Sequence, residues 1–272
     1  EHARGFDTET HLIQPGILAP PLVCGSIARL VDGKPCGRLL AKADARSTFE
    51  ALLERDHLII VGANIAYDML VMAVDAARRG VSLMPRIFAA YKAERVFDLQ
   101  HAEALHGVAL GTLNRHPVTG APLVDPATGK PGRYSQSMCA HLVLGRTDAK
   151  ANDEWRLRYA ELEHTPIDKW PPVARQYPID DAEIALEIAI AQVGGTPTQP
   201  RRLNLHDHAA QVYKAFCLHV NAAWGLRTDP VATEALAAAA QAARDAGLPE
   251  FQRLGFMRED GSECQAEVRA MV

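Results

Sequence analysis

The sequence lacks the features that mark several common classes of protein. Apolar runs such as 58–61 and 142–144 fall far short of the roughly 18 residues that a membrane span needs. The five cysteines are scattered and include no C-x-x-C pair, which excludes the usual zinc and redox motifs. A net charge of only −4 excludes a protein that coats nucleic acid through its charge alone.

What the sequence has is enough apolar material for a folded protein. Its 272 residues are 48% hydrophobic, which excludes disorder and suffices for one large domain or two smaller ones. No basic start followed by an apolar run supports secretion, so we expect a soluble, cytoplasmic protein with reduced thiols. The chain begins at Glu1 without an initiator Met, and we expect a piece of a longer protein.

Hydrophobic patterning predicts strands and helices in alternation over the first half of the chain. The predicted strands are 4–9, 22–31, 37–41 and 58–61, and the predicted helices are 45–55 and 67–79. A turn at Asp32-Gly33-Lys34 joins the second and third strands. This order favours an α/β fold with a mixed sheet and helices on its faces.

The second half is predicted to be helical after one irregular segment. Prolines and glycines between 114 and 133 exclude a helix there and predict a turn-rich excursion or hairpin. The predicted helices that follow are 137–144, 155–162, 172–193, 209–220 and 231–246, the last ending at Gly247. The Gly/Pro-rich stretch 194–200 predicts a boundary between a domain over 1–195 and a helical segment over 196–272.

Two short patterns place carboxylates where predicted elements begin or end. Asp7 and Glu9 lie two residues apart at the end of the first strand, so both can face one point in space. Asn64 and Asp68 lie four residues apart after strand 58–61, which puts them on one face if the helix already begins there.

A third pattern lies near the start of helix 172–193. Tyr177 and Asp181 are again four residues apart, whereas Asp180 does not share this spacing and is expected to be solvated. Four converging carboxylates would repel one another unless a cation neutralises them. Hard oxygen ligands select Mg²⁺ or Mn²⁺ over zinc.

Such a site predicts hydrolysis of a phosphodiester by a metal-activated water. Two ions about 4 Å apart can clamp the attacking and leaving oxygens during in-line displacement. Asp7, Glu9 and Asp181 would be inner-sphere ligands, and Asp68 would hold the second metal directly or through water. Tyr177, with an ordinary pKa near 10, would orient the attacking water rather than remove its proton. Each pattern alone is common on solvated surfaces, so the interpretation depends on all three together.

The three patterns also resemble the motifs of a known family. FDTET, NIAYD and YPIDD resemble the three motifs of the DEDD-type 3′–5′ exonucleases, in the subclass with a tyrosine in the third motif. The resemblance covers about residues 4 to 193. It implies an RNase H-like fold with a mixed, roughly five-stranded sheet flanked by helices.

The resemblance further implies which residues contact the substrate. Thr10, Leu12 and Ile13 follow the first motif, where the 3′-terminal nucleotide is expected with an apolar side chain wedged beside its base. Ordinary loop packing is an equal alternative for these three residues. Asn64 either contacts that nucleotide or is a simple helix cap.

The tail of the chain has a resemblance of its own. AFCLHVNAAWGLRTD, over 215–229, is similar to the start of the thumb in family A DNA polymerases, where it follows the proofreading exonuclease domain. Residues 155–182 look like phage and bacterial members of that family. The palm and finger motifs of a polymerase are absent from this sequence, so the chain cannot synthesise DNA.

Together these resemblances imply a proofreading 3′–5′ exonuclease that serves DNA replication. It would act on single-stranded or frayed DNA 3′ ends with two divalent ions, Mg²⁺ or Mn²⁺, in a bacterial or phage-infected cell. Its expected partners are the DNA end and the rest of a DNA polymerase, and no membrane is expected to take part. One alternative is an RNA-trimming exonuclease of the ribonuclease D type, which shares the three motifs and carries a helical C-terminal domain. Another is a non-catalytic nucleic-acid-binding module with a vestigial site.

Overall fold

The chain forms two compact units, which are described separately. The computed structural model describes residues 2–116, 118–125, 129, 131, 134–147, 153–194, 207–225 and 228–264. The units are Glu1–Trp224 and Gly225–Val272. The division therefore lies later in the chain than the boundary at 195 that the Gly/Pro-rich stretch predicts.

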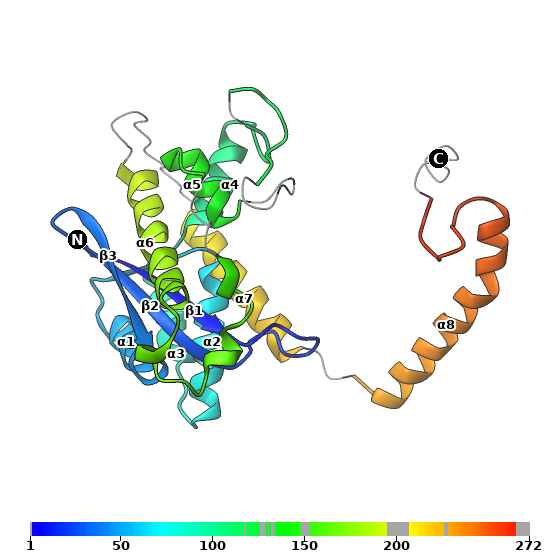
Figure 1. The fold of residues 1–272 in the computed structure, drawn as a ribbon, viewed down its shortest axis with the longest axis horizontal. Helices are drawn as coiled ribbons and strands as arrows, with labels where there is room; N and C mark the ends of the chain where they lie inside the picture. Colours follow the sequence, from blue (N-terminus) through cyan, green and yellow to red (C-terminus); the bar gives the residue numbers. More distant parts are fainter. Residues whose placement is uncertain are drawn as a thin grey trace. The chain divides into compact units, whose positions relative to one another are not determined.

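The first unit is built on a five-stranded sheet of order β3-β2-β1-β4-β5 (Figure 1). The strands are β1 (Ala3–Thr10), β2 (Leu22–Val31), β3 (Lys34–Ala41), β4 (Ile59–Gly62) and β5 (Val96–Asp98). β1, β2 and β3 pair antiparallel, whereas β4 runs parallel to β1 and β5 parallel to β4. The prediction of an α/β fold with a mixed five-stranded sheet flanked by helices is confirmed, and the strand order is consistent with an RNase H-like topology.

Two features of the sheet follow from the local sequence. Asp32 and Gly33 both have positive φ, 50° and 76°, which suits a tight hairpin turn between β2 and β3. β1 pairs with β4 from Ala3 to Gly5. Beyond Gly5, no strand among the described residues pairs with β1 on that side, so the backbone groups there can bond to other partners.

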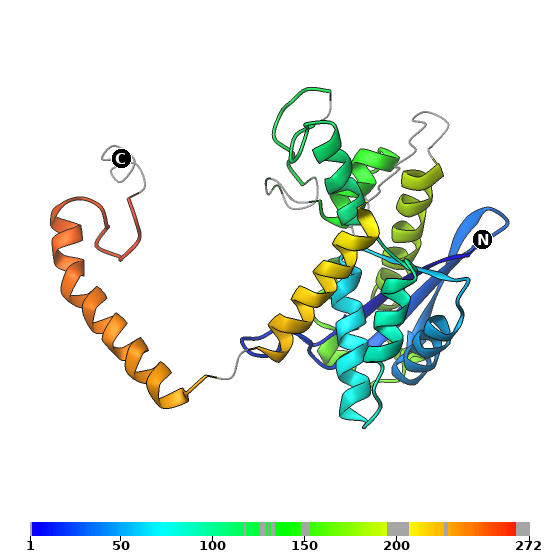
Figure 2. The ribbon, with the colours of Figure 1, turned by 180° about the vertical axis from the view of Figure 1, so that it is seen from behind.

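Helices cover both faces of the sheet (Figures 1 and 2). They are α1 (Lys42–Glu54), α2 (Ile65–Arg78), α3 (Met84–Lys92), α4 (Leu99–Ala109), α5 (Gln136–Leu144), α6 (Pro172–Gly194) and α7 (His208–Trp224). On the α1 face, Phe6 of β1 packs against Phe49 of α1 with ring centroids 5.2 Å apart. On the other face, α6 approaches β1 so closely that a Cβ at Gly5 would collide with the carbonyl oxygen of Ala182.

Helix α7 belongs to the first unit because it is anchored by aromatic packing. Phe216 stacks on Tyr91 of α3 with ring centroids 4.8 Å apart. Phe216 and Val212 are both buried in the main hydrophobic core, which also contains the inner faces of α1 and α2. The same apolar face that predicts an amphipathic helix over 209–220 therefore makes this contact.

Several elements differ from the sequence-based expectation. β5, α3 and α4 are not predicted by the patterning. The expected helix 155–162 is instead two short 3₁₀ turns, η1 (Asp153–Trp155) and η2 (Tyr159–Leu162), and a third turn, η3 (Ile167–Lys169), follows. The Pro/Gly-rich excursion contains the isolated bridges Arg115↔Pro122 and Val124↔Pro131 among its described residues.

The second unit consists largely of one helix, α8 (Pro230–Arg253). The Asp229 side chain caps it by accepting hydrogen bonds from the N–H groups of Val231 and Ala232. The helix continues through Gly247, where the sequence predicts its end. Among the described helices of both units, none combines the length and apolar character that a membrane crossing requires. All five cysteines are free thiols.

Candidate metal centre

Successive side chains of β1 point to opposite faces of the sheet, one covered by α1 and the other by α6. Phe6 points into the core beneath α1, so its neighbours Asp7 and Gly5 face the opposite side, toward α6. Glu9 shares the side of Asp7 because it is two residues further along the strand. The two-residue spacing of Asp7 and Glu9 therefore places both side chains on the face of β1 that lies close to α6.

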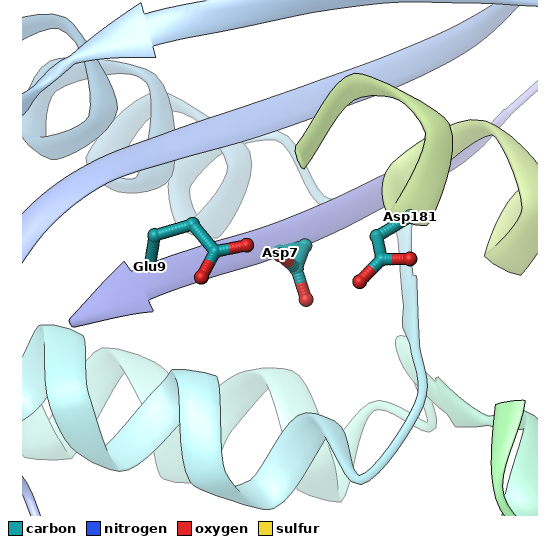
Figure 3. A group of neighbouring side chains, drawn as sticks. All are labelled: Asp7, Glu9 and Asp181. Atoms are coloured by element: carbon teal, nitrogen blue, oxygen red, sulfur yellow. The ribbon is translucent and has the colours of Figure 1, made fainter. Parts of the chain in front are cut away.

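Helix α6 brings a third carboxylate to this pair. The ligand oxygens of Asp7, Glu9 and Asp181 all lie within 4.8 Å of one another (Figure 3). Glu9 and Asp181 are buried, and Asp7 is partly exposed. Asp180, the next residue along α6, instead accepts a hydrogen bond from Gln176 at 2.8 Å and lies outside the group, as the spacing argument predicts.

The surroundings of these three carboxylates, which we call the acidic group, carry a negative potential. Burial raises the pKa of the Cys24 thiol well above its usual value, and the charges of Glu9 and Asp7 raise it further. The Cys24 sulfur is not among the ligand atoms that converge in this group. The remaining donors are carboxylate oxygens, a set that fits Mg²⁺ or Mn²⁺.

Tyr177 lies one helical turn before Asp181 and is 5% exposed. Burial raises its pKa above the ordinary phenol value, and the charges of Asp181, Glu9 and Asp7 act in the same direction, while that of Arg156 opposes them. The side chain is therefore a neutral phenol at physiological pH. It can orient a water molecule by hydrogen bonding but is unsuited to act as a base.

Asp68, the fourth predicted ligand, does not join the acidic group. Its Oδ1 accepts hydrogen bonds from the backbone N–H of Thr8 at 2.9 Å and from the Thr8 hydroxyl at 2.6 Å. Thr8 alternates with Asp7 and Glu9, and its N–H lies on the edge of β1 that β4 leaves open. The Asp68 side chain therefore accepts a backbone hydrogen bond from β1 that a neighbouring strand would otherwise accept.

Asp68 is only 3% exposed, and this burial shifts the pKa of its carboxyl group. Burial raises the pKa of its carboxyl group, the two hydrogen bonds from Thr8 counteract this shift, and the charge of Asp98 adds to it. In the part of the chain that the structure describes, the donors to this carboxylate are neutral groups of Thr8 and of the Asp68 backbone. A bound cation would therefore stabilise the carboxylate strongly.

Of the residues predicted to contact a nucleotide, Thr10 is the last residue of β1, Leu12 and Ile13 follow it in the chain, and Asn64 precedes α2. The Thr10 hydroxyl shares a 2.8 Å hydrogen bond with the Tyr67 hydroxyl of α2. Leu12 and Ile13 are 49% and 57% exposed, so they project from the surface rather than pack into the core. Asn64 occupies the cap position of α2 with left-handed backbone angles, and its side chain makes no capping hydrogen bond.

Sequence reasoning missed Asp98, which organises the start of α2. This carboxylate is fully buried at the end of β5 and accepts hydrogen bonds from the N–H groups of Ile65 at 3.0 Å and Gln100 at 2.8 Å. It thus caps α2 and α4 together and fixes the turn that presents Asp68. An aspartate directly before the apolar segment 99–109 is a recognisable helix-cap signal.

Sequence reasoning also missed the ion pair that fixes the end of β1. Glu163 pairs with Lys42 at 2.8 Å and with His11 at 2.7 Å. The hydrogen bond from Lys42 lowers the pKa of Glu163, and the one from His11 adds to this shift. The segment after η2 is thereby tied to the loop that carries Leu12 and Ile13.

Comparison of the chain with models of known protein families and with curated proteins finds no match.

Proposed function

We propose that this protein is a 3′–5′ exonuclease that hydrolyses phosphodiester bonds at single-stranded or frayed DNA 3′ ends. The observation that carries the proposal is the convergence of Asp7, Glu9 and Asp181 within 4.8 Å. Three carboxylates at this spacing are unfavourable without a cation, and their oxygens are the ligands that Mg²⁺ and Mn²⁺ prefer. The resemblance of the three motifs supports a role as the proofreading part of a family A DNA polymerase.

Each residue has a role that follows from its surroundings. Asp7, Glu9 and Asp181 would hold one divalent ion, and Asp68 would hold a second directly or through water. When bound, such ions supply electrostatic stabilisation of the developing charge and lower the pKa of a bound water. Tyr177, kept neutral by burial, would align the attacking water. Leu12 and Ile13 are exposed where they could contact the terminal base.

The proposal extends to location and partners through the resemblance alone. A proofreading exonuclease would work in the cytoplasm of a bacterial or phage-infected cell, together with the rest of a DNA polymerase. The net charge of −4 predicts weak affinity of this chain for DNA, because few phosphates can be neutralised by its own side chains.

The test is digestion of a 5′-labelled single-stranded DNA oligonucleotide in the presence of Mg²⁺ or Mn²⁺. We expect a ladder that shortens from the 3′ end. Asp181→Asn should slow the reaction by at least about a thousandfold, because loss of a metal ligand removes several kcal/mol of transition-state stabilisation. Asp180→Asn is the matched control, since it removes the same charge one residue away, and it should retain activity.

Two outcomes would contradict the proposal. One is a folded wild-type protein that shortens no strand with either metal. The other is an equal loss of activity in Asp180→Asn and Asp181→Asn. A matching RNA oligonucleotide in the same assay distinguishes a DNA exonuclease from an RNA-trimming enzyme through the ratio of the two rates.

A further inference from the structure

Helix α6 carries a defect immediately beside Tyr177. Pro178 lies inside the helix and has no N–H group, so it cannot donate the usual hydrogen bond to the carbonyl of Ala174. Ala174 is fully buried, which prevents water from satisfying that carbonyl. A buried, unpaired carbonyl is costly, and this one lies in the helical turn that leads to Tyr177.

The hydroxyl of Tyr159 replaces the missing donor. Tyr159 lies in η2, which precedes α6 in the chain, and donates a hydrogen bond to the carbonyl oxygen of Ala174 at 2.9 Å. Burial raises the pKa of Tyr159, with the charge of Glu9 adding to the shift, so the hydroxyl keeps the proton that it donates. The helix thus recovers from another element the hydrogen bond that Pro178 removes.

Packing connects the same side chain to Tyr177. Tyr159 is fully buried, and its ring centroid lies 6.4 Å from that of Tyr177 and 6.0 Å from that of Trp170. These three rings form one hydrophobic cluster with Cys24 of β2, which lies opposite Glu9 in the strand register. Movement of Tyr159 would therefore disturb both the carbonyl of Ala174 and the packing of Tyr177.

We infer that Tyr159 is a positioning residue: it compensates for Pro178 and so fixes the turn of α6 that presents Tyr177 to the acidic group. The inference rests on the proposed nuclease function. It adds to that function the cause of the orientation of Tyr177, which is the hydrogen bond that the Tyr159 hydroxyl donates to α6 from outside the helix.

The test is a mutant cycle of Tyr159→Phe, Pro178→Ala and their combination. Tyr159→Phe keeps the ring but removes the donor, and we expect kcat to fall about tenfold, or about 1.4 kcal/mol, with KM unchanged. The melting temperature should fall by about 2–4 °C. Pro178→Ala supplies a backbone N–H to Ala174, so the double variant should regain most of both losses.

A second cycle distinguishes positioning from general stabilisation. In a Tyr177→Phe background, Tyr159→Phe should lower the melting temperature as before but cause no further loss of kcat. Absence of rescue by Pro178→Ala, or an equal loss of kcat with and without Tyr177, would overturn the inference. A wild-type chain without nuclease activity would contradict the proposed function and the positioning role with it, whereas the unfolding data would still report the hydrogen bond to Ala174.

Discussion

Two buried aspartates of helix α2 have opposite surroundings. Asp75 is 4% exposed and accepts two hydrogen bonds from Arg46, at 2.7 and 2.8 Å, and one from Arg79 at 3.3 Å. Asp68, two turns earlier and 3% exposed, is hydrogen bonded by Thr8, and within the described part of the chain no cationic side chain forms an ion pair with it. The fold thus pairs one buried carboxylate with arginines and leaves the other with neutral donors.

The pKa values of the two carboxyl groups shift in opposite directions. Burial raises the pKa of Asp75, but the hydrogen bond and charge of Arg46 and the charge of Arg79 outweigh it, so the pKa lies below its usual value. Burial raises the pKa of Asp68, and the hydrogen bonds that oppose this shift come from neutral donors, those of Thr8 and of the Asp68 backbone. Asp75 therefore has its counterion within the fold, and Asp68 lies where a cation from solution would supply the missing charge.

Among the substitutions that test the difference between Asp68 and Asp75, the largest expected effect is the loss of nuclease activity when Asp68 is replaced. Asp68→Asn should lower the rate of DNA hydrolysis by at least about a hundredfold, because a second ion would lose its ligand. Its side-chain oxygen can still accept from Thr8, so the free energy of unfolding in metal-free buffer should not fall. Rate assays and urea unfolding measure the two quantities. A fully active Asp68→Asn variant would remove Asp68 from the proposed site.

Asp75→Asn should have the opposite profile. It breaks hydrogen bonds between charged groups, so the free energy of unfolding at pH 7 should fall by about 1–3 kcal/mol. The nuclease rate of the folded variant should stay near that of wild type, because Asp75 lies outside the acidic group. Urea unfolding and the oligonucleotide assay test both expectations. An Asp75→Asn variant that loses nuclease activity but keeps its free energy of unfolding would contradict the structural role assigned to Asp75.

The stability lost in Asp75→Asn should depend on pH. Because the folded state lowers the pKa of Asp75, its contribution is present above the ordinary value of 3.8 and is lost as pH falls through the folded value. Wild type and variant should therefore converge in acid. An unchanged difference between pH 7 and pH 3 would show that the ion pair with Arg46 is not its source.

Strong local patterns predicted much of the fold from sequence. The hairpin of β2 and β3 follows from two strand-forming segments joined by a turn at Asp32-Gly33, and α6 from the predicted helix over 172–193. By contrast, β5 is only three residues long, which is too short for alternation to be recognised. Helix α8 continues through Gly247 and Pro249 because nearby helix-forming residues outweigh the local preference of the glycine.

The candidate site was predictable where one element alone sets the geometry. The spacing of Asp7 and Glu9 in a strand suffices to place them on one side. Asp181 also joins them, but it comes from α6, so its place was expected from the three motifs together and not from one element. The position of Asp68 depends on where β4 stops pairing with β1, which no local pattern reveals. Tyr159 and Asp98 act through contacts with residues of other elements, so their roles emerge only from the folded structure.

Binding of Mn²⁺ to the metal-free protein, measured by calorimetric titration without nucleic acid, tests the acidic group itself. Wild type should bind at least one ion, Asp75→Asn should bind it equally well, and Asp181→Asn should lose it. Asp180→Asn, again the matched control, should behave as wild type. A wild-type protein that binds no Mn²⁺, or an Asp181→Asn variant that binds it unchanged, would contradict the assignment of Asp7, Glu9 and Asp181 as a metal centre.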